Sequence, residues 1–290
     1  MNENAEQIEY WNGPAGGRWA REQDAIDRAF EPFTARLLER VDLRQGAHVL
    51  DVGCGCGATT LAAADAVGAA GSVVGVDVSV PMVARARERS AGRANVAYIR
   101  ADAAVHVFPP SFDAAISRFG VMFFRRPLLA FARLGEALRP GAALGFVCWR
   151  AADENEWVRI PAGVLDPFVP ADPVLAADEP GPFAFADASR VASILGGAGY
   201  TNVAIEPFDA DVVLSIEGLP EAVRFVMATG PAARRLRDAD DDTRARVGAA
   251  LAERLRAYAG DCRVALRGAV WIVTAIRPRS ARRSVDVRLS

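Results

Sequence analysis

The fold is decided by residues 49–57, which read VLDVGCGCG. A short apolar run over residues 47–52 leads directly into three alternating glycines, and residues 59–67 then have a helical pattern. Glycines at such a turn permit a tight bend and let a ligand approach the backbone closely. The stretch therefore predicts a strand, a ligand-binding loop and a helix, with an ordinary strand-to-helix turn as the alternative.

An acidic residue follows this loop at the distance expected in a nucleotide-binding site. Asp77 ends the next β-branched run and lies about 20 residues after Gly57. A carboxylate at this place accepts hydrogen bonds from both hydroxyls of a cofactor ribose. Because Gly53, Gly55 and Ala58 also fit the looser Gly-x-Gly-x-x-Ala pattern of dinucleotide-binding proteins, the loop alone leaves two classes of cofactor open.

Strand and helix patterns alternate up to about residue 150 and continue in looser form beyond it. We expect strands at 47–52, 72–78, 95–99, 112–117, 142–149, 202–207 and 269–276, and helices at 59–67, 81–89, 128–138, 187–196, 219–229 and 241–258. Strands separated by helices form a parallel sheet that is covered on both faces. The sequence therefore predicts an α/β fold, namely a Rossmann-like, doubly wound, mainly parallel sheet of seven strands.

Composition excludes several classes of protein. The chain has 290 residues, 51% hydrophobic and 24% charged, which is enough apolar material for a large core. A net charge of −2 argues against a nucleic-acid partner. Residues 1–9 do not resemble a signal peptide, no apolar run is long enough for membrane insertion, and the four scattered cysteines do not suggest disulfides. We therefore expect a cytoplasmic monomer or homodimer that acts on a small molecule.

All 34 basic residues are arginine, so the chain contains no lysine. Enzymes that form a Schiff base with pyridoxal phosphate need a lysine amine, and the Walker-type phosphate loop needs a lysine to hold its phosphates. Both classes are excluded. The common short-chain nicotinamide reductases, which use a Tyr-Lys pair, are excluded for the same reason.

Several motifs in the right order resemble the class I S-adenosylmethionine (SAM)-dependent methyltransferases. They cover about residues 47–207 and comprise Asp51 before the glycine loop, GVDVSVPM at 75–82, ADA at 101–103, FD at 112–113, LRPG at 138–141 and LGGAGYTNV at 195–203. The chain is most similar to small-molecule enzymes that resemble the quinone-biosynthesis C-methyltransferases, and YWNG at 10–13, SRFGVMFF at 117–124 and CWR at 148–150 resemble a subgroup of these. It departs from the pattern at Ala142, where the family usually has a second glycine, and at Arg118, where the quinone enzymes have a serine.

The resemblance implies SAM as the cofactor and assigns residues to it. Asp51 would lie near the methionine amino group, the loop glycines Gly53, Gly55 and Gly57 would pass beneath the cofactor, Asp77 with Val78 would hold the ribose, and Met82, Asp102 and Ala103 would surround the adenine. Helix capping is the alternative role for Asp77 and Asp102. Trp11 and Trp19, with Tyr10, are predicted to fold over the cofactor, with a core-packing helix as the alternative. Arg18 is expected either to meet the cofactor carboxylate or to lie on the surface, and Arg118 is expected to meet an anionic group on cofactor or substrate.

The acceptor site is expected beyond the carboxyl ends of the strands, where α/β sheets bind ligands. An apolar pocket is predicted from Phe119, Phe123, Trp149, Trp157 and Phe168, with Phe183 and Phe185 as further candidates. No catalytic residue is identified, and His106, Glu154 and Glu156 are weak candidates for a general base. Cys54 and Cys56 lack further ligands nearby, so we expect no metal.

The resulting prediction is a methyltransferase with three parts. Residues 1–40 form an N-terminal helical lid, residues 41–277 form the methyltransferase domain with cap segments at 151–186 and 216–262, and residues 278–290 form a flexible basic tail. The enzyme would transfer the methyl group of SAM to a small, at least partly apolar acceptor by in-line displacement. The alternatives are a nicotinamide-dependent oxidoreductase and a non-catalytic SAM-binding protein.

Overall fold

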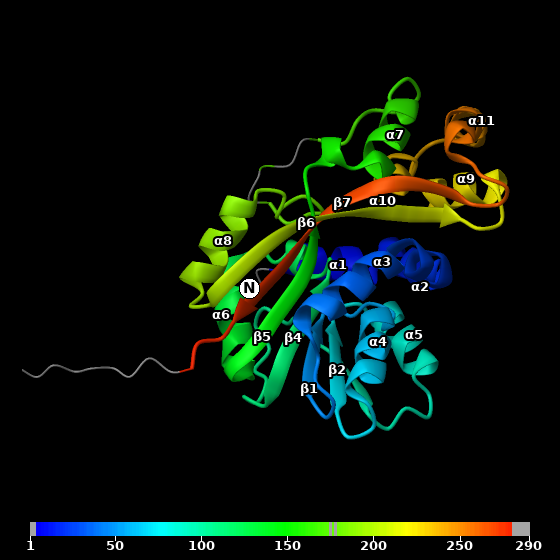
Figure 1. The fold of residues 1–290 in the computed structure, drawn as a ribbon. Helices are drawn as coiled ribbons and strands as arrows, with labels where there is room; N and C mark the ends of the chain where they lie inside the picture. Colours follow the sequence, from blue (N-terminus) through cyan, green and yellow to red (C-terminus); the bar gives the residue numbers. More distant parts are fainter. Residues whose placement is uncertain (1–3, 174–175, 177–178, 280–290) are drawn as a thin grey trace, which may run out of the picture.

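The computed structural model describes residues 4–173, 176 and 179–279, and its centre is a seven-stranded sheet in the order β3-β2-β1-β4-β5-β7-β6 (Figure 1). The strands are β1 (His48–Val52), β2 (Ser72–Asp77), β3 (Val96–Arg100), β4 (Phe112–Arg118), β5 (Leu138–Trp149), β6 (Thr201–Ser215) and β7 (Val264–Ile276). Strands β1 to β5 pair in parallel, whereas β7 is antiparallel to both β5 and β6. The predicted fold class is confirmed. The predicted basic tail lies almost entirely outside the described residues.

Helices cover both faces of this sheet. They are α1 (Ala5–Asn12), α2 (Pro14–Arg21), α3 (Gln23–Val41), α4 (Ala58–Val67), α5 (Val80–Arg89), α6 (Pro127–Ala137), α7 (Glu156–Leu165), α8 (Ala188–Gly197), α9 (Leu219–Ala228), α10 (Gly230–Arg235) and α11 (Asp241–Leu255). Figure 1 shows α3, α4 and α5 on one side of the strands and α6 and α8 on the other. This is the doubly wound arrangement, which leaves the carboxyl ends of the parallel strands open for a ligand.

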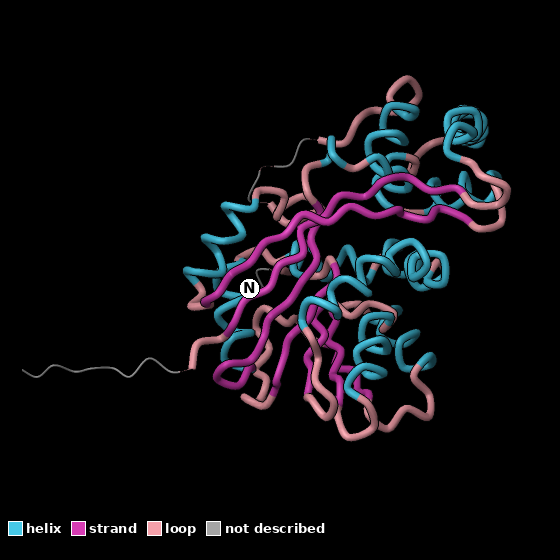
Figure 2. The backbone as a smooth tube through the Cα atoms, in the orientation of Figure 1, coloured by secondary structure: helices cyan, strands magenta, loops and turns pink. Residues whose placement is uncertain are grey.

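The last two strands are much longer than the sequence predicts. They pair from Thr201 opposite Ile276 to Ser215 opposite Val264, and Figure 2 shows them running past the rest of the sheet as a twisted pair. The prediction for β6 ended too early, at residue 207, because its outer half alternates exposed acids with apolar residues. Those acids pair across the strands, Asp209 with Arg267 at 2.6 Å and Asp211 with Arg263 at 2.7 Å.

The two predicted cap segments meet on this strand pair. Helix α7 belongs to the first segment and contacts α10 and α11 of the second, while α9 packs against β6. Figure 1 shows these four helices gathered along the outer parts of β6 and β7. Helix α10 is absent from the sequence prediction, since Gly230 and Pro231 at its start are typical of a turn. The cap thus forms a layer that faces the strand ends.

The N-terminal segment divides into two short helices and one long one. Helix α3 packs against β4, β5, β6 and β7, and its Phe33 and Leu37 are fully buried. Helix α1, in contrast, has no fully buried residue, and α2 contacts α5. The predicted lid residues therefore comprise one helix within the core and two helices that lie beside the ends of the strands. The exact domain boundaries stay a prediction.

Candidate active site

The glycine loop is the floor of the site, and its backbone requires glycine. Gly53, Gly55 and Gly57 have φ of 69°, 52° and 84°, in the left-handed region that other residues rarely adopt. A β-carbon on Gly53 would lie 2.7 Å from the α-carbon of Gly120, at the end of β4, and one on Gly57 would overlap the Tyr98 hydroxyl. The loop therefore packs closely against neighbouring segments, and a ligand can reach it only from the side that borders a cavity.

Asp77 joins this loop to the end of β2. Its Oδ2 accepts a hydrogen bond of 2.9 Å from the backbone N–H of Gly55, and its Oδ1 accepts one of 2.8 Å from Ser79 N–H. The side chain is 9% exposed, and burial raises the pKa of Asp77 from its usual value. Two backbone donors thus fix the carboxylate in one orientation beside the loop.

Asp51 lies fully buried beneath the same loop. Its Oδ2 accepts a hydrogen bond of 2.6 Å from the Thr60 hydroxyl, whereas no described residue donates to its Oδ1. Burial is the main cause that raises the pKa of Asp51 to about 7. A buried carboxylate oxygen without a donor is costly in a protein, which sets Asp51 apart from Asp77.

A cavity of about 130 Å³ lies between this loop and the ends of β2, β3 and β4. The predicted cofactor residues in its wall are Trp11, Trp19, Gly53, Gly55, Asp77, Val78, Met82, Asp102, Ala103 and Arg118. Asp51 and Gly57 are not part of this wall, and Arg18 lines the neighbouring pocket instead. The structure thus brings together most of the predicted cofactor residues. We call this space the cofactor cavity.

Helix α1 lies across the cofactor cavity and is held there by polar contacts. Asn4 Nδ2 is 3.0 Å from both carboxylate oxygens of Asp102. Asn12 donates to the carbonyl of Val78 at 3.0 Å, and the Ser79 hydroxyl donates to the carbonyl of Trp11 at 2.7 Å. The sequence did not predict a role for Asn4 or Asn12, because a polar residue at a helix end gives no indication of the distant residue that it contacts.

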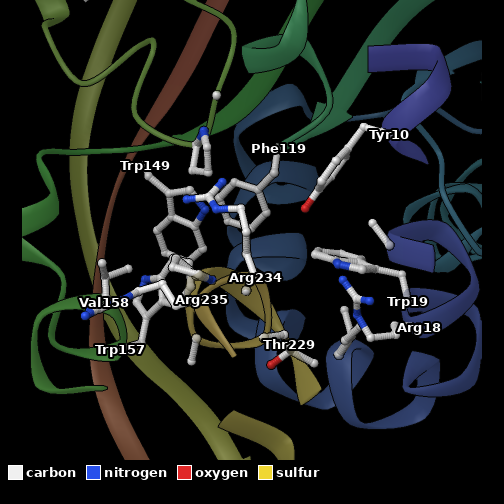
Figure 3. A pocket seen from close by; sticks show the side chains of 18 of the residues that line it. Tyr10, Arg18, Trp19, Phe119, Trp149, Trp157, Val158, Thr229, Arg234 and Arg235 are labelled. Carbon is white, nitrogen blue, oxygen red and sulfur yellow. The ribbon is translucent and has the colours of Figure 1, made fainter. Parts of the chain in front are cut away.

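A second, larger pocket of about 510 Å³ adjoins the cofactor cavity (Figure 3). One wall is aromatic: the rings of Phe119 and Trp149 stack with centroids 4.2 Å apart, and Trp157 lies 4.7 Å from Trp149. Tyr10, Arg18 and Trp19 form the opposite side in Figure 3. Helix α9 contributes Phe225, α10 contributes Arg234 and Arg235, and Thr229 lies between the two helices. We call this space the large pocket.

The two cavities share part of their walls. Gln7, Trp11, Trp19, Phe119 and Phe123 line both of them. The Trp11 ring is at the centre of this partition, with its centroid 5.5 Å from that of Trp19 and 5.4 Å from that of Phe123. Any group that passes from one ligand to the other would do so here, between apolar rings.

Phe119 has a strained backbone at this partition. Its φ of 66° lies in the left-handed region, which costs a residue with a side chain on the order of 1–3 kcal/mol. Contacts with neighbouring residues offset this strain. The Phe119 N–H donates to Val147 O at 3.0 Å, and the ring packs on Trp149, Phe30 and Phe33. Backbone strain of this kind gathers at functional sites.

The structure keeps other predicted acceptor residues away from the large pocket. Phe119, Phe123, Trp149 and Trp157 line it as predicted, but Phe168 does not, and its ring lies 5.2 Å from the Arg246 guanidinium. The Phe185 ring is 1% exposed and packs in the core near Phe131 and Phe146. Phe183 is half-buried and is likewise not part of the wall.

The candidate bases lie outside both cavities. The His106 ring packs on Phe108, with centroids 4.5 Å apart. Glu154 pairs with Arg150, and Glu156 accepts a hydrogen bond of 3.1 Å from Arg267 N–H. Both glutamates therefore contact residues at or beside β5 and β7 and do not line the neighbouring pocket. Among the residues that the structure describes, the acids in the wall of the large pocket are Glu6 and Glu179.

Arg118 is buried beside the cofactor cavity, and its guanidinium already has polar and aromatic partners within the protein. Its guanidinium donates to the Thr34 hydroxyl at 2.9 Å, lies 3.9 Å from the Asp27 carboxylate and packs over the Phe30 ring at 5.6 Å. Burial lowers the pKa of Arg118. These contacts leave it a weaker anion receptor than the sequence suggests.

The cysteines carry no sign of metal or thiolate chemistry. Burial raises the pKa of Cys54 and raises that of Cys56 to about 12, so both stay thiols at neutral pH. Within the described part of the chain, no cluster of three or more His, Cys, Asp or Glu side chains is placed to hold a metal ion. In the same residues, no helix is long and apolar enough to cross a bilayer.

Comparison with known proteins identifies the class. Residues 49–141 match a family model described as a methyltransferase domain. The chain is 35% identical to nocamycin O-methyltransferase of Saccharothrix syringae, over 60% of this chain and 66% of that protein. It is 34% identical to aklanonic acid methyltransferase of Streptomyces sp. (strain C5), over 40% of this chain and 54% of that protein. The chain thus spans only part of the length of these relatives.

Solved structures agree on the fold. A methyltransferase structure from Bacillus halodurans has a TM-score of 0.53 at 19% identity, covering 84% of this chain and 98% of that one. Phosphoethanolamine N-methyltransferase 2 of Haemonchus contortus has a TM-score of 0.56 at 19% identity, covering 95% of this chain and 59% of that one. The sheet order, the glycine loop and its two acids define a class I methyltransferase fold. Residues 49–141 therefore form a methyltransferase domain, and the chain is similar to the class I SAM-dependent methyltransferases, as its sequence predicts.

Proposed function

We propose that this protein transfers the methyl group of SAM, bound in the cofactor cavity, to a small and partly apolar acceptor bound in the large pocket, by in-line displacement. The observation that carries this proposal is the shared partition, because two adjoining cavities with a common wall place two ligands end to end. A cytoplasmic monomer or homodimer is part of the proposal. The names of the relatives, which include an O-methyltransferase for nocamycin, support a small-molecule acceptor.

The residues of the cofactor cavity fit SAM. The donor-free Oδ1 of Asp51 matches the ammonium of the methionine part, and the fixed carboxylate of Asp77 matches the ribose hydroxyls. Gly53 and Gly55 hold the loop in a left-handed turn at the wall of the cavity, and the missing side chain of Gly53 allows Gly120 to approach closely. Met82 and Ala103, both buried, offer an apolar slot for the adenine. When bound, SAM supplies an electrophilic methyl group on a sulfonium.

Helix α1 admits the cofactor by moving. The cofactor cavity is narrow because α1 lies across it, and α1 is held by side-chain hydrogen bonds rather than by buried apolar residues. Segments with little buried apolar surface open at low free-energy cost. Asn4, Asn12 and Ser79 therefore act as latches that close the helix again over the bound cofactor. Closure excludes water from the partition and strengthens electrostatic contacts within it.

The protein positions the acceptor and does not supply a strong base. The large-pocket wall holds the aromatic rings of Phe119, Trp149 and Trp157, and no described residue in it is a histidine or cysteine. The dry, apolar partition favours an anionic acceptor atom meeting a sulfonium, because charge is lost in the transition state. Gln7 borders both cavities, and its Oε1 is buried with no hydrogen bond from any described residue. It is placed to orient a donor group of the acceptor.

Calorimetric titration with S-adenosylhomocysteine, the product of the cofactor, tests the proposal, with NADH and NADPH as parallel controls. We expect micromolar binding of S-adenosylhomocysteine and no binding of either nicotinamide. Binding of a nicotinamide in its place would instead support an oxidoreductase. Binding of S-adenosylhomocysteine combined with no methyl transfer from SAM to any aromatic or quinone-like acceptor would support a non-catalytic SAM-binding protein.

A further inference from the structure

Arg18 has an unusual environment in the large pocket. It lies in the last turn of α2, is half-buried, and lines the large pocket but not the cofactor cavity. No carboxylate of the described residues forms an ion pair with its guanidinium, and none of their acceptors takes a hydrogen bond from it. The guanidinium thus borders the large pocket rather than the cofactor cavity, and no described carboxylate balances its charge.

The other arginines of this wall have partners or are exposed to solvent. Arg234 pairs with Asp172 at 2.7 Å. Arg235 pairs with Asp166 at 2.9 Å and donates to the carbonyls of Val169 and Pro170, which satisfies its guanidinium. Arg125 and Arg237 are exposed, so water screens their charges. Arg18 thus differs from its neighbours in being half-buried and without an anionic partner.

The surroundings of Arg18 are apolar and aromatic. Trp19 and Tyr10 lie beside it, and Phe119, Trp149 and Trp157 face it across the pocket (Figure 3). A guanidinium in such a place acts in a medium of lower dielectric than water, so its attraction for an anion is stronger than on the surface. Flat aromatic rings bind other flat rings by stacking and edge contacts. The pocket volume of about 510 Å³ is in the range that holds a small organic ligand.

We propose that the acceptor is a planar aromatic acid, whose ring packs against Phe119, Trp149 and Trp157 and whose anionic group binds Arg18. The inference deepens the proposed function and rests on it, since it names the class of molecule that takes the methyl group. Arg18 is a specificity-determining residue in this account. It selects acids over neutral molecules of the same shape, because a neutral ligand would leave the guanidinium both desolvated and without a partner.

Two matched probes test the inference: 2-naphthoate, a planar acid, and 2-naphthamide, its neutral isostere. Each is titrated into the 290-residue chain saturated with S-adenosylhomocysteine, and its dissociation constant is measured by calorimetry. We expect 2-naphthoate to bind about tenfold or more tightly than 2-naphthamide, as a charge-assisted pair predicts. Arg18→Gln is expected to remove this preference and to leave the affinity for 2-naphthamide and for S-adenosylhomocysteine unchanged. Arg18→Lys should restore part of it, because a charge remains without the planar fork.

Arg21→Gln is the matched control, since Arg21 is an exposed arginine of the same helix that lines neither cavity. It should bind all three ligands as the unmodified protein does. Equal affinity of the unmodified protein for the two probes, or no binding of either probe, would overturn the inference. So would an Arg18→Gln variant that loses S-adenosylhomocysteine but keeps the preference for 2-naphthoate, because Arg18 would then serve the cofactor. Failure of the unmodified protein to bind S-adenosylhomocysteine would contradict the proposed function instead.

Discussion

The cofactor cavity and the large pocket are neighbours, but they are built in different ways. The cofactor cavity has acidic side chains at or just after the ends of two neighbouring parallel strands, Asp77 at β2 and Asp102 after β3, with Asp51 buried nearby in β1. The large pocket is assembled from segments as distant as α1 and α10, and aromatic rings dominate its inner wall. The difference indicates that the cofactor site is fixed by backbone geometry, whereas the acceptor site depends on how separate segments pack. Mutations in the two regions are therefore expected to have separable effects.

The largest expected effect comes from filling the glycine loop. Gly53→Ala should lower the free energy of unfolding by about 3 kcal/mol, since the new methyl combines a left-handed backbone with overpacking against Gly120. Gly46→Ala is the matched control: Gly46 also has a positive φ, of 80°, but a β-carbon there would meet nothing within 4 Å. It should cost only about 1 kcal/mol. Urea unfolding measures both, and equal losses would show that the close approach to Gly120 is unimportant.

The next effect concerns the ribose carboxylate. Asp77→Ala should weaken binding of S-adenosylhomocysteine by about 2–3 kcal/mol, through the loss of one or two charge-assisted hydrogen bonds. Binding of 2-naphthoate in the large pocket should be much less affected. Calorimetry of both ligands on a variant shown to be folded by circular dichroism provides the measurement. Unchanged affinity for S-adenosylhomocysteine would contradict the proposed position of the cofactor.

Asp51 predicts a dependence on pH that only the cofactor should show. Its pKa of about 7 means that the carboxylate is ionised above neutrality and becomes protonated below it. An ammonium binds the ionised form, so the affinity for S-adenosylhomocysteine should fall as the pH drops through 7, by about tenfold per unit at the lower end. The Asp51→Asn variant should bind S-adenosylhomocysteine weakly, and its affinity should not change between pH 6 and pH 8. A wild-type profile that is equally flat would contradict this role of Asp51.

The smallest effect is expected in the large pocket. Trp157→Leu removes part of the aromatic wall and should weaken the binding of 2-naphthoate by about 1 kcal/mol, while the affinity for S-adenosylhomocysteine stays the same. Trp271→Leu is the matched control, because Trp271 lies on β7 outside both cavities and donates to Ala186 O at 2.8 Å. Equal losses in the two variants would show a general loss of packing rather than a contact with the acceptor.

The same contrast explains what the sequence was able to predict. The glycine loop and Asp77 carry a local signal, because a strand that ends in glycines, with an acid about 20 residues further on, is typical of nucleotide-binding sites. Asp102 was predicted through the resemblance to the methyltransferases. Seven strands in alternation with helices therefore sufficed for the fold class. The inner parts of β6 and β7 were predicted because they have an apolar strand pattern. Their outer halves were not predicted, because exposed ion pairs replace the apolar pattern there.

The acceptor side was only partly predictable. Aromatic residues signal burial but not which space they face, so Phe119 and Trp157 line the pocket while Phe168 and Phe185 pack elsewhere. The latches of α1 and the place of Arg18 depend on contacts between segments that are distant in sequence. Asn4, for example, meets Asp102 across 98 positions of the chain. No spacing rule reports such a contact.

A crystal structure of the protein with S-adenosylhomocysteine would show which of the two cavities holds the cofactor. The account predicts that the nucleoside occupies the cofactor cavity, with its ribose at Asp77 and its ammonium at Asp51, and that the sulfur faces the partition at Trp11 and Phe119. Helix α1 should be closed over it, and the large pocket should remain open to an acceptor. S-adenosylhomocysteine bound within the large pocket, with the glycine loop uncontacted, would contradict the account.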